Sequence, residues 1–600
     1  KTINPMKKLT LLAVALLAAA SVSAKSWIRT NLIGYVNTLP KVAVVIADTP
    51  TEVATFDVCE ARSGKVVFTG KAIAKDASIW GMKSAYRLPF TELSKEGSYY
   101  IKIGDTRSEN FRIGNDIYAD AGNMPLFYMR QQRCGYNPYT GEDCHQYDGY
   151  IVDHPTRTGE HIDVRGGWHD ATDQLQYLMT SANATFQMLF AYYKNPDQFT
   201  DKFNAAGDKG KNGVPDILDE ARWGLEWMKR MNPDSAVMFN QIADDRDHTG
   251  IREPHTDMVD YGYGPGKGRP VYFITGEIQG LGKYKNRNTG VASAAAKYAS
   301  AFAMGAVLFE KFDPEFAESM KKKAVDAMAF AEAKPGAFHG VCYKEPYFYE
   351  EANWIDDMEL AAIALHLMEP ENEYWLKRAD YWGELEPITP WMETGKARHY
   401  QWYPFVNVGH YLIAEAGNDA QKAKYESYMG EGLMHIENRA GEDPFYHGVP
   451  YHWCSNNFTF GALTQLRLYH ELTGDNKYLE MEAALLDWIF GCNPWGTTMI
   501  CEYPEGVDTP TDPHAIYIKS RNGSIYGGLI DGPLYKTIND GMIGVSQGDD
   551  DPLKPFQNGI AVYHDFFGDF STNEPTMDGT ASMTYYLSTL SALGKDVKKK

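Results

Sequence analysis

Two segments far apart in the chain carry carboxyl groups suited to acid–base chemistry. Residues 166–173 read Gly-Gly-Trp-His-Asp-Ala-Thr-Asp and place Asp170 and Asp173 three positions apart. Residues 568–579 lie roughly 400 positions later and offer Glu574 in a polar turn. Cleavage of a glycosidic bond uses such a pair, with one carboxyl group protonated at the leaving oxygen and the other ionised as base or nucleophile.

A plainer interpretation of these residues stays open. We expect a helix to start near residue 172, and a spacing of three then puts Asp170 and Asp173 on one face of its first turn. Like charges this close share protons and can hold one water, but Asp170 could equally cap the helix, with Asp173 at its positive end. Two glycines directly before the pair let backbone approach a ligand closely, which favours a site.

Length and charge limit the class of protein. A chain of 600 residues is too long for one small core and indicates two domains, one of them large. The formal net charge is -21, with no basic run beyond the C-terminal lysines, which argues against nucleic acid or an anionic membrane as partner. The aromatic content of 13% favours a carbohydrate ligand only slightly, because aromatic rings also fill cores. We expect a monomer.

The N-terminal residues have the pattern of an export signal. Residues 6–8 are Met-Lys-Lys, residues 9–20 are apolar apart from one threonine, and residues 22–24 carry small residues at the positions of a cleavage site. We expect residues 1–24 to be a signal peptide, with residues 1–5 an extension before the start methionine. No cysteine lies near the cleavage site, so the sequence predicts a periplasmic or secreted protein rather than a lipoprotein, without a membrane span.

Cysteine usage leaves the redox state open. An oxidising compartment permits disulfides, but an odd count leaves at least one cysteine unpaired or bound to metal. The seven cysteines are Cys59, Cys134, Cys144, Cys342, Cys454, Cys492 and Cys501.

Strand and helix patterns divide the chain in two. Residues 25–114 contain strand-length runs at 41–46, 54–58, 66–68 and 98–103, separated by turns, and predict a small β-sandwich. Residues 117–597 predict helices, many with apolar residues at i, i+3, i+4 and i+7. The twelve expected helices cover about 119–133, 172–194, 214–231, 291–312, 315–333, 356–369, 373–386, 405–418, 419–438, 457–473, 477–491 and 579–593. Six helical hairpins could form a closed double ring or an open superhelix.

The connections between the helices are unequal. Residues 232–290 and 492–578 are long and rich in glycine, proline, aspartate and aromatic residues, and long connections in compact domains are usually functional. Trp402, Tyr451 and Trp453 lie in connections and are candidate sugar platforms, although each could equally belong to the core.

Two further groups have spacings that could bind metals. Cys134, Cys144, His145 and His169 offer two thiolates and two imidazoles, which suit tetrahedral zinc, although a Cys134–Cys144 disulfide is the structural alternative. A second stretch has spacing like that of an EF-hand loop, although a plain helix cap explains it almost as well. Its oxygen ligands would come from Asp208, Asn212, Val214, Asp216 and Asp219.

Taken together and in this order, several segments resemble glycoside hydrolase family 9. Residues 170–173 look like its Asp-Ala-Gly-Asp motif, and residues 573–574 resemble its catalytic Asn-Glu. Residues 491–496 followed by 513–514 resemble its Asn-Pro…Pro-His segment, and residues 128–135 and 212–220 resemble further signatures. Residues 28–35 resemble the start of the immunoglobulin-like module often fused in front. The similarity covers nearly the whole mature chain.

The resemblance implies an (α/α)6 barrel and an inverting hydrolase of β-1,4-glucans that needs no catalytic cofactor. Carried over, Asp173 is the base that activates water, Asp170 helps to hold that water, and Glu574 is the acid. His514 would contact sugar hydroxyls. Some members of the family carry a zinc with this ligand type, which would be structural here, and calcium sites are frequent in the family.

This chain departs from the family at two motifs. Ala515 and Ile516 replace the second His and the Arg of a Pro-His-His-Arg motif, and Thr172 replaces a Gly that the first turn of a helix would tolerate losing. The first departure leaves the glucan open among cellulose-like, xyloglucan and mixed-linkage chains. The alternatives are an exo-acting oligosaccharidase and a non-catalytic glycan-binding protein.

Overall fold

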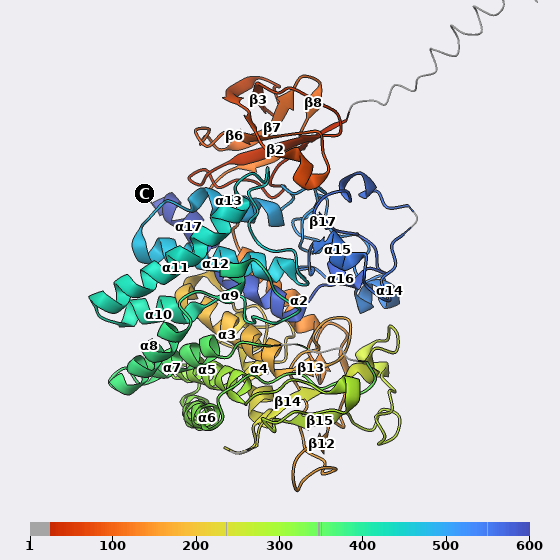
Figure 1. Ribbon diagram of the computed structural model, residues 1–600, viewed down its shortest axis with the longest axis vertical. Helices are drawn as coiled ribbons and strands as arrows, with labels where there is room; N and C mark the ends of the chain where they lie inside the picture. Colours follow the sequence, from red (N-terminus) through yellow and green to blue (C-terminus); the bar gives the residue numbers. More distant parts are fainter. Residues whose placement is uncertain (1–24, 236, 346–348, 350, 549, 600) are drawn as a thin grey trace, which may run out of the picture.

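The fold has a β module at one end of a larger helical domain (Figure 1). The computed structural model describes residues 25–235, 237–345, 349, 351–548 and 550–599. The expected signal peptide, residues 1–24, lies outside the described residues.

The β module is a sandwich of two antiparallel sheets, as predicted. The first has the order β1 (Ser26–Arg29), β2 (Val42–Ala47), β6 (Ser84–Pro89) and β5 (Ile73–Ala74). The second has the order β4 (Val66–Lys71), β3 (Thr55–Glu60), β7 (Gly97–Ile103) and β8 (Thr106–Arg107), and β9 (Phe111–Ile113) also pairs with β7. Alternate residues point inward and form one apolar core that includes Val45, Val58, Leu88, Ile101 and Phe111.

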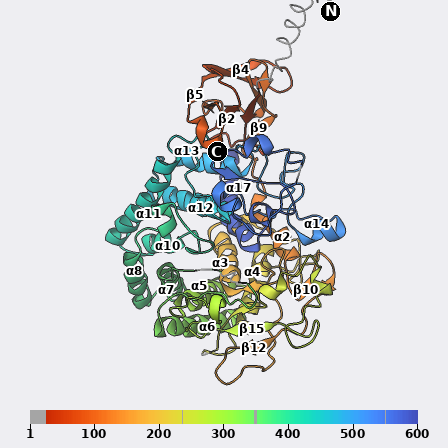
Figure 2. The same cartoon turned by 45° about the vertical axis from the view of Figure 1, so that its right-hand side comes forward.

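Six inner helices close into a ring, and this confirms the (α/α)6 barrel. They are α3 (Leu178–Lys194), α5 (Ala292–Phe309), α7 (Ile355–Met368), α10 (Val408–Ala416), α12 (Ser455–Thr473) and α17 (Met577–Lys599). Each packs against the next, and α17 packs back against α3. The outer helices are α2 (Pro125–Gln131), α4 (Asp216–Met231), α6 (Pro314–Ala333), α8 (Glu373–Leu385), α11 (Asp419–Ala440) and α13 (Leu479–Ile489) (Figure 2).

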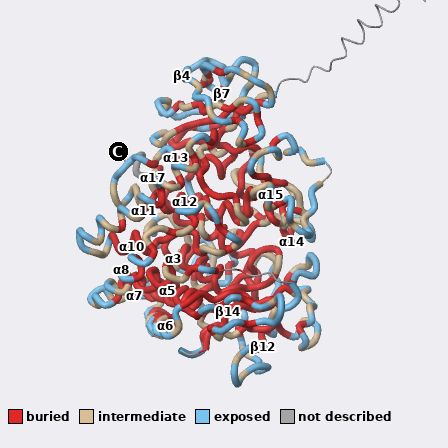
Figure 3. Tube along the Cα trace, in the orientation of Figure 1, coloured by how far each residue is buried: buried red, intermediate tan, exposed pale blue. Residues whose placement is uncertain are grey.

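The two rings differ in how far their residues are buried, because the inner helices are covered on all sides and the outer helices on one side only. Figure 3 shows buried residues concentrated along α3, α5 and α12, with exposed residues on α6, α8 and α11. Helix α5 is long and apolar enough to cross a membrane by length and composition, but 89% of it is buried within the protein. Its small residues therefore serve close packing in the inner ring.

The β module is anchored to the barrel by Trp80, at the end of a short 3-10 turn (Ala77–Trp80). Its ring packs edge-on against Trp495 and lies 5.6 Å from Trp488 between ring centroids. Its Nε1–H donates to Asp443 Oδ1 at 3.0 Å, and Arg87 forms a 2.7 Å ion pair with Glu480 of α13. Both modules therefore share one continuous core at this junction.

A small sheet on the barrel positions the loops of the site. Its strands have the order β12 (Tyr150–Val152), β15 (Pro270–Phe273), β14 (Phe239–Ile242) and β13 (Gln176–Tyr177). Strand β13 runs directly into α3, and the segment between β14 and β15, residues 243–269, lies beside it. The connection from Asp170 into α3 is thereby placed next to a long loop rich in charged residues.

The predicted helix start at residue 172 is wrong, because α3 begins at Leu178. Asp170 and Asp173 therefore do not share the first turn of a helix, and Thr172 is not a helical residue. The backbone N–H of Thr172 donates to Glu574 Oε1 and that of Gln174 donates to Asp247 Oδ2. Partners distant in sequence thus satisfy the donors that a helix would have used.

Candidate active site

A cleft of about 400 Å³ brings together the two segments that carry the carboxyl groups. Its volume is in the range of a small-molecule or sugar site. Its lining includes several charged groups and a cluster of aromatic rings. The lining residues are Thr172, Asp173, Asp247, His248, Gly250, Ile251, Arg252, Glu345, Trp453, His514, Phe570 and Glu574.

Asp173 and Glu574 both line this cleft, while Asp170 lies beneath it. Glu574 follows α16 (Phe570–Asn573), and its Oε1 accepts from the Thr172 N–H at 3.0 Å. Asp173 Oδ1 accepts from the Leu175 N–H at 3.0 Å, and its side chain is 17% exposed. One candidate acid and one candidate base thus share a single cleft.

Asp170 is 2% exposed, and protein groups engage both of its carboxyl oxygens. Oδ1 accepts from Thr180 Oγ1 at 2.6 Å, and Oδ2 accepts from the Tyr349 hydroxyl. Its backbone carbonyl accepts from the Met577 N–H at 2.9 Å. Asp170 therefore joins the segment of Asp173 to the segment of Glu574 from below.

The electrostatics of the cleft favour a protonated Glu574. Burial raises the pKa of the Glu574 carboxyl and the nearby Asp173 charge adds to this, although His514 and the Thr172 N–H act in the opposite sense. Burial likewise raises the pKa of Asp170 well above its usual range, with Asp173 contributing. A carboxylic acid kept neutral is what proton donation to a leaving oxygen requires.

His248 adds a positive charge beside Asp173. Burial lowers its pKa, but the carboxylates of Asp173, Asp247 and Glu574 outweigh burial and raise the pKa of His248 to about 9. Its Nε2 lies 4.0 Å from Asp173 Oδ2. The polar wall therefore carries a protonated imidazole next to the candidate base at neutral pH.

Part of the lining, called the aromatic wall below, consists of Trp453, Phe570 and His514. The ring centroids of Trp453 and Phe570 lie 5.9 Å apart, and Phe570 lies 5.9 Å from the His514 ring. Trp453 Nε1 donates to Asp531 Oδ2 at 2.7 Å, and His514 Nδ1 donates to the Phe567 carbonyl at 2.6 Å. These bonds fix the orientation of rings that could stack on the apolar faces of sugars.

Two of the expected sugar platforms do not line the cleft. Tyr451 is 4% exposed and stacks on His447 within the aromatic cluster around Trp80 and Trp488, so its assignment was wrong. Trp402 is partly buried, packs against the main core and donates to the Lys396 carbonyl at 3.2 Å, and its role as a platform stays a prediction. Trp453 and His514 are the expected substrate residues that reach the cleft.

The four residues of the expected cysteine–histidine set lie close together in the structure. The ligand atoms of Cys134, Cys144, His145 and His169 all lie within 4.8 Å of one another. Cys134 Sγ lies 3.4 Å from His145 Nδ1, which lies 3.3 Å from His169 Nε2. His145 Nε2 points the other way, to Asp257 Oδ2 at 3.1 Å. Along the described chain all seven cysteines are free, so the alternative Cys134–Cys144 disulfide is not formed.

This arrangement fits a tetrahedral metal ion. Two sulfur and two nitrogen ligands are the donor set of structural zinc, and a carboxylate on the outer nitrogen of a histidine ligand is the usual way to fix its ring. Three members are buried and His145 is half-buried, so a bound ion would have little contact with solvent.

The expected calcium loop stays a prediction, but protein groups already contact several of its carboxylates. Asp216 Oδ1 accepts from the N–H groups of Lys202 and Phe203, and Asp208 accepts from the Tyr136 hydroxyl. Protein donors therefore occupy the carboxylates that would have faced a cation. Asn212 Nδ2 donates to Asp219 Oδ2 at 2.8 Å. Among the described residues, the cysteine–histidine set alone gathers three or more histidine, cysteine or acidic ligand atoms.

Sequence reasoning missed several residues of the cleft. Asp247, His248 and Arg252 belong to the segment between β14 and β15, inside the long connection that was expected to be functional. The dense run of charges at residues 244–248 was the available signal. Phe570 stands four positions before Glu574 and carries no signal of its own without the fold.

A closed double ring of helices whose cleft combines a carboxyl group of raised pKa, a second carboxyl group and aromatic rings is the arrangement of a glycoside hydrolase. Residues 118–587 match the model of glycosyl hydrolase family 9, and residues 23–108 match the cellulase N-terminal ig-like domain. The chain belongs to glycosyl hydrolase family 9 and is a cellulase-like enzyme, as the resemblance implied.

Similar proteins agree with this assignment. Endoglucanase D of Acetivibrio thermocellus is 22% identical over 511 residues, covering 82% of this chain and 74% of its own. A xyloglucan-specific endo-beta-1,4-glucanase of Bacteroides ovatus is 24% identical over 621 residues, covering 97% of this chain and 96% of its own. A metagenome-derived family 9 endoglucanase of known structure is 26% identical, with a TM-score of 0.75 over 94% of this chain and 99% of that one.

Proposed function

We propose that the protein is an exported, inverting endo-β-1,4-glucanase in which Glu574 is the general acid and Asp173 the general base. The observation that carries the proposal is the pairing in one cleft of a carboxyl group with a raised pKa and a second, partly exposed carboxyl group. Asp170, with both oxygens engaged, positions the segment of Asp173.

The reaction follows from these positions. Glu574 transfers its proton to the glycosidic oxygen as the bond from that oxygen to the anomeric carbon breaks. Asp173 accepts a proton from a water molecule, whose oxygen attacks the anomeric carbon from the opposite face. The sugar leaves with inverted configuration, and proton exchange with solvent restores both carboxyl groups.

The aromatic wall supports a glucan as substrate, because β-1,4-linked glucose presents flat apolar faces to rings such as Trp453 and Phe570. Arg521, near the missing His-Arg pair, forms a bidentate ion pair with Glu253 at 2.8 Å and does not line the cleft. Fewer charged groups therefore contact the sugar hydroxyls than the family motif implies. We favour xyloglucan, on which the similar Bacteroides ovatus enzyme acts.

The test is a time course on xyloglucan, carboxymethylcellulose, mixed-linkage glucan and cellohexaose. Mid-sized early fragments from one polymer, with an α-configured new reducing end by proton NMR, support the proposal. Early release of glucose or cellobiose alone indicates the exo-acting alternative. Binding without any product indicates a glycan-binding protein.

A structural zinc at Cys134, Cys144, His145 and His169 belongs to the same proposal. The ion would supply a cross-link between the loop after α2 and the segment before Asp170, and no step of the reaction passes through it. Elemental analysis should find about one zinc per chain, and N-terminal sequencing of the exported protein should find cleavage after Ala24. Zinc-free protein of unchanged melting temperature would contradict the first, and retention of Met6 would contradict the second.

A further inference from the structure

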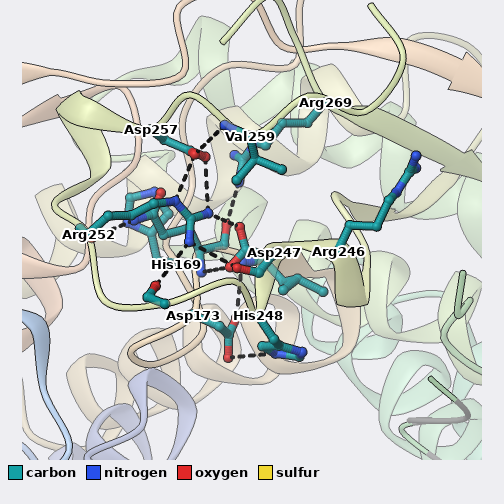
Figure 4. Close-up of polar contacts among 12 residues, drawn as sticks. His169, Asp173, Arg246, Asp247, His248, Arg252, Asp257, Val259 and Arg269 are labelled. Carbon is teal, nitrogen blue, oxygen red and sulfur yellow. Dashed lines mark hydrogen bonds and ion pairs between the residues drawn. The ribbon is translucent and has the colours of Figure 1, made fainter. Parts of the chain in front are cut away.

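The cysteine–histidine centre and the candidate base are connected through the segment between β14 and β15. Figure 4 shows Asp257, Arg252 and Asp247 of this segment in a continuous series of polar contacts that leads to the neighbourhood of Asp173 and His248. These charged groups are largely buried, so their contacts are poorly screened by solvent.

The first connection starts at His145. Its Nε2 lies 3.1 Å from Asp257 Oδ2, and Arg252 Nε donates to Asp257 Oδ1 at 2.7 Å. Arg252 Nη2 then donates to Asp247 Oδ1 at 2.5 Å, and Nη1 donates to the Asp247 carbonyl at 2.9 Å. One guanidinium group therefore bridges the carboxylate that holds a metal ligand and the carboxylate at the cleft.

The connection ends on the residue that follows Asp173. Asp247 Oδ2 accepts from the Gln174 N–H at 2.7 Å, and Gln174 Nε2 donates to the Arg252 carbonyl at 2.8 Å. Asp247 is 1% exposed and Gln174 is fully buried. A movement of Asp247 would therefore move the peptide between Asp173 and Gln174, because a close-packed interior transmits displacements between neighbouring groups.

A second connection reaches the same residue from the other side. Arg269 Nη2 lies 3.6 Å from Cys134 Sγ and donates to Asp148 Oδ2 at 2.7 Å. Arg269 Nη1 donates to the Gln174 carbonyl. The C=O of Gln174 is thus held by Arg269, which contacts Cys134 directly. Its N–H is held by Asp247, which reaches His145 through Arg252 and Asp257.

We propose that Arg252 is a positioning residue through which the occupancy of the cysteine–histidine centre sets the position of Asp173. The inference rests on the proposed function, because it assigns the base to Asp173. Without an ion, two thiol groups and two imidazoles have no common partner, so His145 can turn and release Asp257. Arg252 would then keep Asp247 in place less well. Partners of this outer kind typically change metal affinity about 10–100-fold.

The chain offers a matched control. Arg246 lies in the same segment and forms a bidentate ion pair with Asp244, at 2.8 Å and 2.6 Å. Figure 4 shows Arg246 directed away from Asp257, so its removal deletes a comparable ion pair without cutting either connection.

The experiment compares wild type, Arg252→Gln, Asp257→Asn and Arg246→Gln as zinc-loaded and chelator-stripped proteins. Zinc affinity is measured by competition with a chromogenic chelator, and kcat and KM are measured on the best glucan. In wild type and Arg246→Gln, stripping should lower kcat about tenfold with KM nearly unchanged. In Arg252→Gln and Asp257→Asn, kcat should be low already and insensitive to stripping, and zinc should bind about 10–100-fold more weakly. Arg252→Gln and Asp257→Asn interrupt the same connection, so the test remains possible if one of the two variants fails to fold.

The ratio of loaded to stripped kcat separates positioning from simple stability, which would change the melting temperature and leave that ratio intact. The inference is overturned if this ratio is the same in Arg252→Gln and Asp257→Asn as in wild type. It is also overturned if removal of zinc leaves the kcat of wild type unchanged. A loaded wild type that hydrolyses no glucan would refute the proposed function instead. The zinc affinities would then still test the connection, and equal affinity in all four proteins would overturn it.

Discussion

The substitution Glu574→Gln tests the assignment of acid and base most directly. Glu574 Oε1 accepts from the Thr172 N–H, and the amide oxygen of glutamine can keep that bond. The amide nitrogen occupies the place of the hydroxyl but transfers no proton to the leaving oxygen. We therefore expect Glu574→Gln to keep its fold and to lose only the ability to protonate the leaving oxygen.

The expected size of the loss depends on the leaving group. A positioned general acid contributes about 10²–10⁴-fold, equivalent to about 3–5 kcal/mol of barrier. A sugar leaving group needs this proton, whereas dinitrophenolate is a good leaving group without it. For Glu574→Gln, kcat/KM on cellohexaose should fall about 10³-fold, but on dinitrophenyl β-cellobioside less than about tenfold.

Asp173→Asn should behave differently, because both substrates need an activated water molecule. We expect it to lose about 10²–10⁴-fold on both. Glu253→Gln is the control, since this carboxylate pairs with Arg521 outside the cleft lining. Equal losses on both substrates for Glu574→Gln, at an unchanged melting temperature, would refute Glu574 as the acid.

The other predictions concern pH, the aromatic wall and the junction between the modules. Because the pKa of Glu574 is raised, the alkaline limb of kcat/KM on cellohexaose should follow that pKa, with a fall of about tenfold per pH unit above it, and the same alkaline limb on the aryl glycoside would contradict this. Trp453→Ala should raise KM about tenfold, roughly 1.4 kcal/mol, while Trp402→Ala changes KM little; equal effects would show that Trp453 is not a platform. Burial raises the pKa of Asp443 from 3.8 to about 6, so the stability that its neutral form contributes is present below pH 3.8 and lost as pH rises through 6. In urea denaturation, the unfolding free energy of Asp443→Asn should therefore be about 3 kcal/mol higher than that of wild type at about pH 8 and equal to it near pH 4. A gain in unfolding free energy that does not depend on pH would contradict the argument. Trp80→Ala should lower the unfolding free energy by about 3–5 kcal/mol, and a loss below 1 kcal/mol would show that the junction is not packed as described.

The sequence predicted features that depend on local pattern. The β-sandwich and the helices followed from periodicity and turn residues, and the helix expected at 457–473 does end at Thr473. The four cysteine and histidine ligands were found because their residue types are rare and chemically specific. Ring closure was not determined by pattern, because open and closed stacks bury the same helix faces.

The errors arose where distant partners decide the local structure. Helix α3 begins late because Glu574 and Asp247 take the backbone donors of Thr172 and Gln174. Tyr451 is buried because Trp80, from the other module, packs against it. Local sequence patterns carry no information about such distant partners. Residues 208–219 likewise match a calcium-loop spacing, although several of their carboxylates accept hydrogen bonds from other protein groups.

The junction at Trp80 also has a consequence for the order of events during synthesis. Trp80 is made 363 positions before Asp443, its hydrogen-bond partner. At about 5–20 residues per second, the ribosome needs roughly 20–70 seconds to supply that partner. Throughout this interval Trp80, Val44 and Ile46 lack their partners in the barrel, so an apolar surface that favours aggregation stays uncovered. The underside of the sandwich is therefore covered only after the chain has been made as far as Asp443, well into the barrel.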